Sequence, residues 1–447
     1  MFEFGRDLRR MLQPKVPFAP TREGLTGGDP SLLELLDVDL LKAEAKASDV
    51  AAGRISAKDR PALNLRQAVV WRELARRTGE PEALRKAAAA AETALKAISR
   101  QSRPQAWARA RLEQAHCALL GAELFGDHGL SAAADFALAE AAGVARRGPI
   151  AADAEAARAR IGAAACEAAA VPALIDRSER ALTVLEAPVR GRAGPQPAIQ
   201  ARADRGEMLL AAGERLHDER LIDLALADFA KASAALDPAY EPVSFARVAS
   251  LRGQAMVALG ESRAEAKIIA EGVAVIASQF EQLDRDHSPL DWARGQLALA
   301  RGLQALGEAA DSAEAFEQAQ LAYDRALVVL RRRPALGLCA VAGVNRALCL
   351  ARSAERSGDL FTLDAAEAAM RCELAAAEPS RDPVPWAVCQ LALARLYETR
   401  VHLTGRDEGR RAKAAMAFSA ALDVFAEQGL RSLSDVAAEG LGRLKRL

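Results

Sequence analysis

A glycine followed by an acidic residue recurs along this chain at a nearly constant interval. The pairs stand at Gly79-Glu80, Gly126-Asp127, Gly213-Glu214, Gly260-Glu261, Gly307-Glu308 and Gly358-Asp359, and Gly405 follows with Asp407 one place late. The steps are 47, 87, 47, 47, 51 and 47 residues, and the step of 87 is close to two periods. Self-similarity over about 20 to 50 residues is typical of repeat arrays. The sequence therefore predicts a stack of like units.

Prolines interleave with these glycines at similar intervals. They stand at Pro61, Pro104, Pro149, Pro195, Pro242, Pro289, Pro334 and Pro383. Proline suits the first position of a helix and glycine the position after its end. Each unit is therefore predicted to run proline, first helix, glycine turn, second helix. The acid after the glycine is placed to favour the positive N-terminus of the second helix.

Composition indicates an all-α protein. Hydrophobic residues make up 51% of the 447 residues, but aromatic residues only 4%, and alanine supplies much of the apolar total. Alanine has the highest helix propensity and allows helix axes to approach closely. Runs of β-branched residues bounded by turn residues, which would indicate strands, are scarce.

Charge and hydropathy exclude further classes of protein. Basic and acidic residues balance at 60 each, whereas a chain that mainly binds nucleic acid normally carries a basic excess, so we predict no nucleic-acid partner. The first 12 residues lack the apolar core of a signal peptide. No apolar run reaches about 18 residues, so we predict no transmembrane segment and a cytoplasmic location.

No constellation for metal binding or catalysis is recognisable. The six cysteines form no C-x-x-C pair and lie in apolar helical patterns, which predicts small buried hydrophobes: Cys117, Cys166, Cys339, Cys349, Cys372 and Cys389. The five histidines form no H-E-x-x-H motif, and neither a phosphate loop nor G-x-S-x-G is present. We therefore predict no metal, no cofactor and no enzymatic activity.

Both helices of the unit carry recurring aromatic residues. In four first helices the aromatic lies three residues after the proline, at Trp107, Phe245, Trp292 and Trp386. Its helical spacing with later leucines predicts packing rather than a ligand pocket. In the second helices an aromatic stands between small residues, as in Ala319, Tyr323 and Ala326, and again at Phe136, Phe229 and Phe418. This pattern predicts a ring that fills a groove where two helices cross.

These motifs together resemble the tetratricopeptide repeat. The segment ALADFAKASAALDP (225–238) resembles the second helix of that repeat with its closing proline, and Leu259-Gly260 and Leu306-Gly307 resemble its first turn. Standard repeats have about 34 residues, whereas the units here are near 47, so their helices or turns must be longer. The resemblance covers roughly residues 61–428 and implies a right-handed α-solenoid of about eight stacked helical hairpins.

Both ends of such an array need capping helices. Residues 31–60 are predicted to form the N-terminal cap, with Asp29 or Ser31 as its N-cap residue, and residues 429–447 the C-terminal cap. Residues 1–30 are predicted to be a flexible tail with a short amphipathic helix. Two interpretations of that tail stay open: a docking peptide for a membrane surface or partner groove, or a terminus that folds back on the first hairpin.

The resemblance implies a concave groove, lined by the first helices, that grips an extended peptide or partner helix. Arginines recur there five residues after the proline, at Arg109, Arg202 (counted from Pro197), Arg247 and Arg294, and twelve after it, at Arg301, Arg346 and Arg395. The two offsets differ by two helical turns and share a face. Either this face grips carboxylates of an acidic peptide, or it is solvated and pairs with acidic residues of adjacent hairpins.

The function predicted from these features is a non-catalytic adaptor or scaffold that binds a peptide or partner protein in the concave face. Two alternatives stay open. One is a regulator whose solenoid responds to a small peptide, and the other is a peripheral membrane adaptor that docks through residues 1–12.

Overall fold

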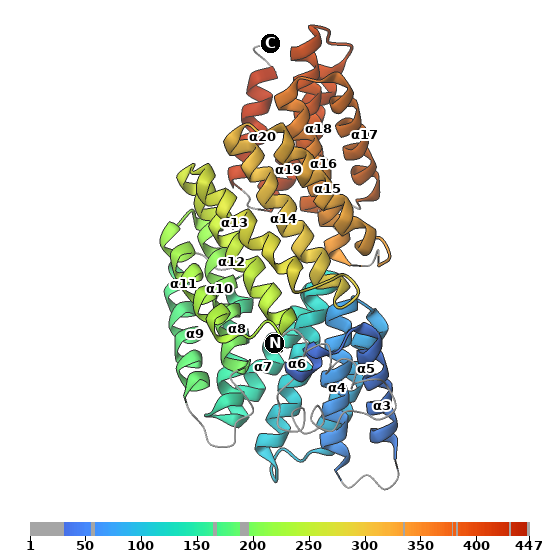
Figure 1. Cartoon of the computed structure of the whole chain (residues 1–447). Coiled ribbons are helices and arrows are strands. Elements are labelled where there is room, and N and C mark those ends of the chain that lie inside the picture. The colour runs from blue at the N-terminus through green and yellow to red at the C-terminus, as the bar shows by residue number, and fades with distance from the viewer. Residues whose placement is uncertain are drawn as a thin grey trace. The chain divides into compact units, whose positions relative to one another are not determined.

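The computed structural model describes residues 31–54, 59–163, 168–187, 196–333, 336–377, 379–380, 383–428 and 431–444. Within these ranges the chain forms 18 α-helices, labelled α3 to α20, and no strand (Figure 1). The predicted all-α class is therefore confirmed. The predicted tail, residues 1–30, lies outside the described residues, as does Cys166.

The helices alternate as first and second members of pairs. The first helices are α4 (Arg60–Thr78), α6 (Pro104–Phe125), α8 (Pro149–Ala163), α10 (Gln196–Leu216), α12 (Pro242–Arg263), α14 (Pro289–Ala310), α16 (Gly337–Ser357) and α18 (Pro383–Thr404). The second helices are α5 (Pro81–Ala97), α7 (His128–Ala145), α9 (Val171–Glu186), α11 (Glu219–Ala235), α13 (Ala266–Ser278), α15 (Ala313–Leu330), α17 (Leu360–Ala376) and α19 (Arg410–Glu427). The remaining elements are η1 (Ser31–Leu35), α3 (Val38–Gly53), η2 (Ala168–Ala170), η3 (Gln279–Glu281) and α20 (Arg431–Leu444).

The chain divides into two compact units, Met1–Gly302 (unit 1) and Leu303–Leu447 (unit 2), with the boundary inside α14. From α4 to α13 and from α15 to α19, each helix packs on the next one along the chain. The first helices of successive pairs also touch, α4 with α6, α6 with α8, α8 with α10 and α10 with α12 in unit 1, and α16 with α18 in unit 2. The first helices of a unit therefore form a layer of their own.

The predicted role of the prolines is confirmed. Proline occupies the first position of α6, α8, α12, α14 and α18, and the second position of α4 and α10. Backbone N–H groups in the first turn of a helix make no hydrogen bond within the helix, so proline, which lacks this group, costs none there. Helix α16 begins at Gly337. Pro195 and Pro334 lie outside the described residues, and the proline at the second position of α10 is Pro197.

The recurring glycines are of two kinds. Those of the first kind form the predicted turn at the end of a first helix. Gly79, Gly126 and Gly358 follow α4, α6 and α16 with φ of 68°, 68° and 65°. This left-handed conformation is open to glycine without strain. The acid after the glycine also acts as predicted at Asp127 and Asp359, whose side chains accept N–H groups in the first turn of α7 and α17.

For the second kind, Gly213, Gly260 and Gly307, the turn prediction is wrong. These glycines lie inside α10, α12 and α14, which continue for about one more turn. The left-handed residues there are His217, Ala264 and Asp311. A Cβ added to Gly260 would lie 2.6 Å from Cγ1 and 2.9 Å from N of Ile269, so the absent side chain lets α12 and α13 approach closely. Gly260 is therefore required for the close packing of α12 on α13 rather than for the turn.

The aromatic prediction for the second helices is confirmed at three of its four positions. Phe229, Tyr323 and Phe418 are almost completely buried. Phe136 is instead 62% exposed, with the guanidinium of Arg111 5.8 Å from its ring centroid. The buried face of α7 includes Ala134, Ala137, Leu138 and Ala141. Phe136 does not lie on that face, so its side chain points towards solvent.

A helix is present at each end of the described chain. Asp37, whose carboxylate accepts the N–H of Leu40 at 2.8 Å, is the N-cap of α3, so the predicted cap at Asp29 or Ser31 is wrong for this helix. The reason is that residues 31–35 form the separate 3-10 helix η1. At the other end Ala437 of α20 is fully buried, and Leu433, Leu441 and Leu444 pack on the apolar core of unit 2. None of the helices described here has an apolar stretch long enough to cross a membrane.

Candidate functional site

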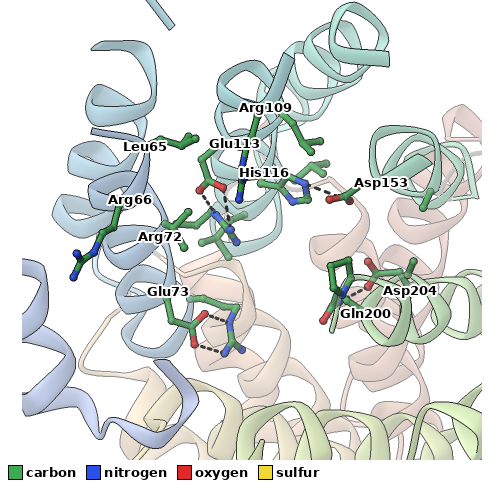
Figure 2. Close-up of a pocket in the computed structure, with 18 of the residues that line it drawn as sticks. Leu65, Arg66, Arg72, Glu73, Arg109, Glu113, His116, Asp153, Gln200 and Asp204 are labelled. Atoms are coloured by element: carbon green, nitrogen blue, oxygen red, sulfur yellow. Dashed lines mark hydrogen bonds and ion pairs between the residues drawn. The ribbon is translucent and has the colours of Figure 1, made fainter. Parts of the chain in front are cut away.

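The first helices of unit 1 enclose a cavity of about 730 Å³, which we call the chamber (Figure 2). Its walls come from α4, α6, α8 and α10, from the beginnings of α12 and α14, and from η1. Its charged lining residues are Arg66, Arg72, Arg76, Arg103, Arg109, Arg160, Arg247 and Arg294 together with Glu34, Asp59, Glu73, Glu113, Glu123, Asp153 and Asp204. Leucines, alanines, Val69, Ile98 and two prolines fill parts of the wall between them.

Adjacent first helices are joined across the chamber by ion pairs. Arg72 of α4 donates from Nε and from a terminal nitrogen to the two oxygens of Glu113 on α6, at 2.6 Å and 3.2 Å. This two-point geometry is the strongest arrangement of the pair. Figure 2 shows Arg72 and Glu113 facing each other between the two helices.

Two further arginines of α4 contact a single carboxylate, that of Glu73. Glu73 accepts hydrogen bonds from Arg76 at 2.9 Å and 2.7 Å, and from Arg77 at 2.7 Å. Burial raises the pKa of Glu73, but the two guanidinium groups outweigh burial and hold that pKa well below its ordinary value. Glu73 is therefore ionised throughout the physiological pH range.

Helices α6, α8 and α14 meet at Glu123. Arg294 of α14 contacts its carboxylate at 2.6 Å and Arg160 of α8 at 3.3 Å. Burial raises the pKa of Glu123, but Arg294 and Arg160 outweigh it and lower the pKa to about 2. Asp204 of α10 accepts a hydrogen bond from Arg247 of α12 at 2.9 Å, so ion pairs also join these two helices at the chamber wall.

One histidine lines the chamber. The Nε2 atom of His116 on α6 lies 3.6 Å from a carboxylate oxygen of Asp153 on α8. Burial lowers the pKa of His116, but Asp153 outweighs burial, so the pKa is raised above its ordinary value. His116 is therefore more readily protonated near neutral pH than a free histidine.

All seven carboxylates of the chamber are engaged. Besides those described above, Asp59 accepts the N–H of Ala62 in the first turn of α4, and Glu34 accepts N–H groups at the start of α12. Six of the eight arginines also have acidic partners. Arg103 and Arg109 of α6 have neither an ion pair nor a side-chain hydrogen bond within the described part of the chain, and Leu65, Ile98 and Ala106 line the chamber with them. The chamber thus holds two positive charges that no protein carboxylate in these ranges compensates.

The seven arginines predicted as partner-binding residues are not all brought together. Arg109, Arg247 and Arg294 line the chamber. Arg202 does not, and pairs with Asp228 at 2.9 Å, while Arg301 is 52% exposed and pairs with Glu214 at 2.6 Å. In unit 2 the remaining two contact acids of neighbouring helices, Arg346 with Asp324 at 2.5 Å and Arg395 with Glu355 at 3.0 Å. Of the seven, Arg109 is the one without an acidic partner in the described ranges.

Sequence reasoning missed the carboxylates that alternate with these arginines, and also Arg72, Arg76 and Arg160. A signal for some of them was available, because Arg109, Glu113 and His116 are spaced four and three residues apart and so share a helix face. No comparable signal exists for Glu34. Its partners in the chamber wall lie 209 and 210 residues away.

Across the described ranges no three His, Cys, Asp or Glu side chains lie close enough to hold an ion. Cys117, Cys349 and Cys389 are buried as predicted, Cys339 is partly buried, and Cys372 is exposed, so the prediction of burial is wrong for Cys372.

Comparisons with known proteins identify the fold. No family model matches the chain, and no curated protein matches it. Two solved structures of monomeric IFIT1 mutants, one with m7Gppp-AAAA and one with Gppp-AAAA, align with TM-scores of 0.51 and 0.52. Each is 14% identical over 91% of this chain and 77% of IFIT1. A Rap protein complexed with Competence and Sporulation Factor aligns over 87% of this chain and 98% of its own at 11% identity, with a TM-score of 0.41.

IFIT1 contains tetratricopeptide repeats. The chain is therefore a tetratricopeptide-repeat-like helical repeat protein, as the sequence motifs predicted.

Proposed function

We propose that this chain is a non-catalytic binding protein whose chamber receives a short acidic segment of a partner protein. The observation that carries the proposal is the pair of uncompensated arginines, Arg103 and Arg109, in a chamber whose carboxylates are all engaged. Arg109 is partly buried whereas Arg103 is exposed, so a ligand that supplies an anion gains most at Arg109, whose guanidinium is partly shielded from water without a counter-charge. A carboxylate matches the planar donor geometry of arginine.

The size of the chamber supports a short ligand rather than a folded domain. Its volume of about 730 Å³ lies within the range of roughly 300–1,000 Å³ typical of small-ligand sites. The mixed lining of charged groups and aliphatic side chains suits a peptide of a few residues, which offers both kinds of surface. A partner protein would therefore enter through one extended segment.

The chemistry of the lining favours a peptide over a nucleic acid. None of the residues that line the chamber is Phe, Tyr or Trp, so it lacks the aromatic platforms on which unpaired bases usually stack. Its eight arginines are also nearly balanced by seven carboxylates, whereas nucleic-acid sites carry a clear positive excess. The IFIT1 structures with capped RNA make nucleic acid the alternative that a binding experiment must include.

The proposal predicts that Arg109→Gln weakens peptide binding. The probe is a library of hexapeptides passed over the immobilised full-length chain, with retained peptides identified by mass spectrometry and their Kd measured by calorimetry. We expect enrichment in Asp and Glu, and a loss of about tenfold to 100-fold in affinity for Arg109→Gln, because a hydrogen bond to a charged group contributes about 1.5–3 kcal/mol.

Arg85→Gln is the matched control. Arg85 lies on the second helix α5, is 74% exposed and pairs with neighbouring Glu82, so its replacement should leave the Kd unchanged. Retained peptides without acidic residues, or equal binding by Arg109→Gln and the wild type, would refute the proposal. A parallel titration with 5′-triphosphorylated tetra-adenylate tests the alternative, and tight binding that depends on Arg109 would favour RNA instead.

The remaining predictions of the sequence stay as proposals. Absence of catalysis is part of the proposed function, and so is a cytoplasmic location, which imaging of a tagged chain would test. The membrane-docking alternative depends on residues 1–12, which lie outside the described residues.

A further inference from the structure

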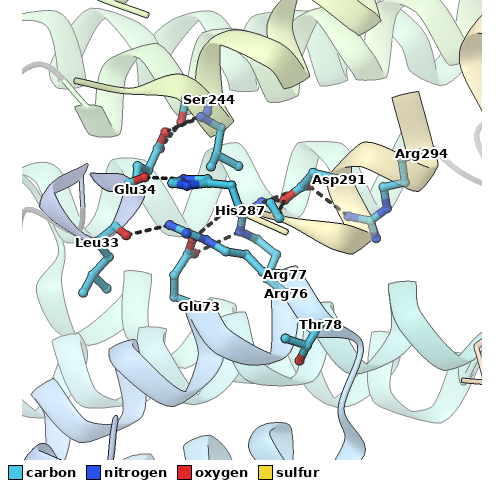
Figure 3. Close-up of polar contacts among 12 residues, drawn as sticks. Leu33, Glu34, Glu73, Arg76, Arg77, Thr78, Ser244, His287, Asp291 and Arg294 are labelled. Atoms are coloured by element: carbon cyan, nitrogen blue, oxygen red, sulfur yellow. Dashed lines mark hydrogen bonds and ion pairs between the residues drawn. The ribbon is translucent and has the colours of Figure 1, made fainter. Parts of the chain in front are cut away.

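The N-terminal segment 31–37 is fixed to the first helical pair through its backbone. Arg77 of α4, whose side chain is fully buried, donates to the carbonyl oxygens of Leu33 at 2.7 Å and of Leu36 at 2.5 Å (Figure 3). The same guanidinium bonds Glu73, so its charge remains compensated. Leu33 is itself fully buried.

The same segment supplies the cap of a helix about 200 residues away. Oε2 of Glu34 accepts the N–H of Val243 at 3.0 Å and the N–H of Ser244 at 2.8 Å, and Oε1 bonds the hydroxyl of Ser244. These donors belong to the first turn of α12, whose own N-cap residue, Glu241, makes no side-chain capping bond. Glu34 therefore takes the role that a local Ser, Thr, Asp or Asn usually has.

Further contacts join the first pair to the loop before α14. Nε2 of His287 lies 2.7 Å from the carbonyl oxygen of Glu34. Beside it, Arg76 of α4 donates to both oxygens of Asp291 in the first turn of α14, at 3.1 Å and 3.0 Å. Figure 3 shows Glu34 between Ser244 and His287, with Arg76 and Asp291 alongside. These contacts bond η1 to α12 and to the loop before α14, and they bond α4 to α14.

Glu34, Glu73, Arg76 and Ser244 all line the chamber, so these contacts form one of its walls. The closing segment is a five-residue 3-10 helix, whereas α4, α6, α8, α10 and α12 are full helices packed on both sides by their neighbours. We propose that residues 31–37 form a clasp, whose release from α12 opens the chamber to its ligand and whose closure retains it. The role of the clasp in admitting a ligand rests on the proposed function, but its opening is measured without any ligand, so the two proposals fail separately.

The bonds of Glu34 fit both of its protonation states. The two backbone donors share Oε2, while Oε1 contacts only a hydroxyl, which donates to a carboxylate or accepts from a carboxylic acid. Burial raises the pKa of Glu34 to about 7, and the nearby carboxylate of Glu73 adds to this rise, while the bonds from Ser244 and the charge of Arg76 oppose it. The other charged or titratable groups that face the segment are Arg77 and His287.

The sign of the pH effect follows. In the open state Glu34 is exposed to water and returns towards its ordinary pKa near 4.5. The closed state therefore binds the proton more tightly, and its stabilisation by that proton is fully present below about pH 4.5 and lost as the pH rises through about 7. Release of the clasp is expected to become more frequent between these values and to level off above them.

Hydrogen exchange of the full-length chain, followed by mass spectrometry, tests the clasp. For Glu34→Ala we expect exchange at the first turn of α12 and at residues 33–36 to accelerate at least about tenfold, because three donors lose their acceptor. Exchange in α10 and α11 should stay unchanged. Glu34→Gln keeps an acceptor oxygen, so its clasp should stay closed. In the wild type we expect opening to increase from pH 5 to 8, after the exchange rates are corrected for intrinsic chemical exchange. Glu34→Gln should not show this increase.

Asp127→Ala is the matched control, because Asp127 makes the same kind of bond, to the N–H groups of Gly129 and Leu130, but beside its own helix. Its effect should be confined to the first turn of α7. Unchanged exchange at Val243 and Ser244 in Glu34→Ala would overturn the clasp. So would acceleration throughout unit 1, which would make the segment an inseparable part of the fold, or an identical pH response in Glu34→Gln and the wild type.

Discussion

Unit 1 and unit 2 are built from the same alternation of first and second helices, but their interiors differ. In unit 2, helices α16 to α20 pack on one apolar cluster that includes Met370, Tyr397, Phe418 and Phe425. In the first pairs of unit 1 the apolar clusters are small and dominated by alanine, and the first helices face a chamber lined by arginines and carboxylates. The repeat thus specifies how helices pair. The residues on the inner face of the first helices decide whether this layer of helices encloses an apolar core or a cavity lined by charged side chains.

This difference has consequences for stability. Burial of apolar surface depends little on pH or salt, whereas ion pairs depend on both. Unit 2 should therefore respond most strongly to loss of side-chain volume, and unit 1 to changes in charge, backbone approach and pH. Three predictions test this contrast, in order of decreasing effect.

The largest effect is expected for Phe418→Ala in unit 2. Phe418 is completely buried in the apolar cluster, so its truncation should lower the free energy of unfolding by about 3–5 kcal/mol in urea titrations followed by circular dichroism. Met416 lies on the same helix but is 74% exposed, and Met416→Ala should have almost no effect. Equal effects of the two substitutions would show that the cluster does not hold unit 2 together.

A smaller effect is expected at the glycines inside first helices, and it should differ between the units. An added methyl at Gly260 in unit 1 would meet backbone atoms of Ile269 and Glu265, whereas at Gly307 in unit 2 its three nearest atoms would belong to the ring of Phe316, a side chain that is able to shift. Gly260→Ala should destabilise by about 1–3 kcal/mol and Gly307→Ala by less.

Gly143→Ala serves as the control for these glycines, because it lies within α7 with nothing within 4 Å of the added methyl. It should stabilise by about 0.5–1 kcal/mol through helix propensity. If Gly260→Ala were also stabilising, close approach of α12 and α13 would not explain the conserved spacing of these glycines within this chain.

The smallest effect concerns Glu123 in unit 1. Its pKa is lowered to about 2 from 4.5, so the stability that it contributes is present above about pH 4.5 and is lost as the pH falls towards 2. Glu123→Gln should cost only about 1 kcal/mol at pH 7, since its side chain is 41% exposed and water screens its pairs. Thermal melts at pH 3 and pH 7 should differ less for this variant than for the wild type.

Glu92→Gln is the control for this measurement, since Glu92 forms an exposed pair with Lys96 on α5 and should not alter the melting temperature at pH 7. A wild-type chain whose melting temperature is unchanged by acid between pH 5 and 3 would contradict the role assigned to the ion pairs of unit 1.

Much of the helical architecture was predictable because its signals are local. Proline at a helix start, glycine in a left-handed turn and a ring between alanines each depend on a few neighbouring residues, and they correctly located the pairs, the turns after Gly79, Gly126 and Gly358, and the buried rings of Phe229, Tyr323 and Phe418. The same local rules failed at Gly213, Gly260 and Gly307, because the pattern does not distinguish a glycine needed for φ from one needed for close packing.

The site was only partly predictable. The offset of five residues from proline correctly brought Arg109, Arg247 and Arg294 to one cavity, but the same count selected Arg202, which the course of α10 directs to Asp228 instead. A helix face is defined by spacing, whereas what it faces depends on the rotation of that helix against its neighbours. Carboxylates that neutralise an arginine from another helix have no fixed distance in sequence.

The amino-acid sequence by itself determined that this protein is a series of paired helices, where most of them begin, and which rings they bury, since helix propensity, capping and periodicity act over a few residues. Only the tertiary structure decided that the chain forms two units, that Glu34 and Arg76 bond η1 and α4 to α12 and α14, and that Arg103 and Arg109 remain uncompensated in the chamber. Those features arise from contacts between residues up to 253 positions apart, which no local pattern encodes.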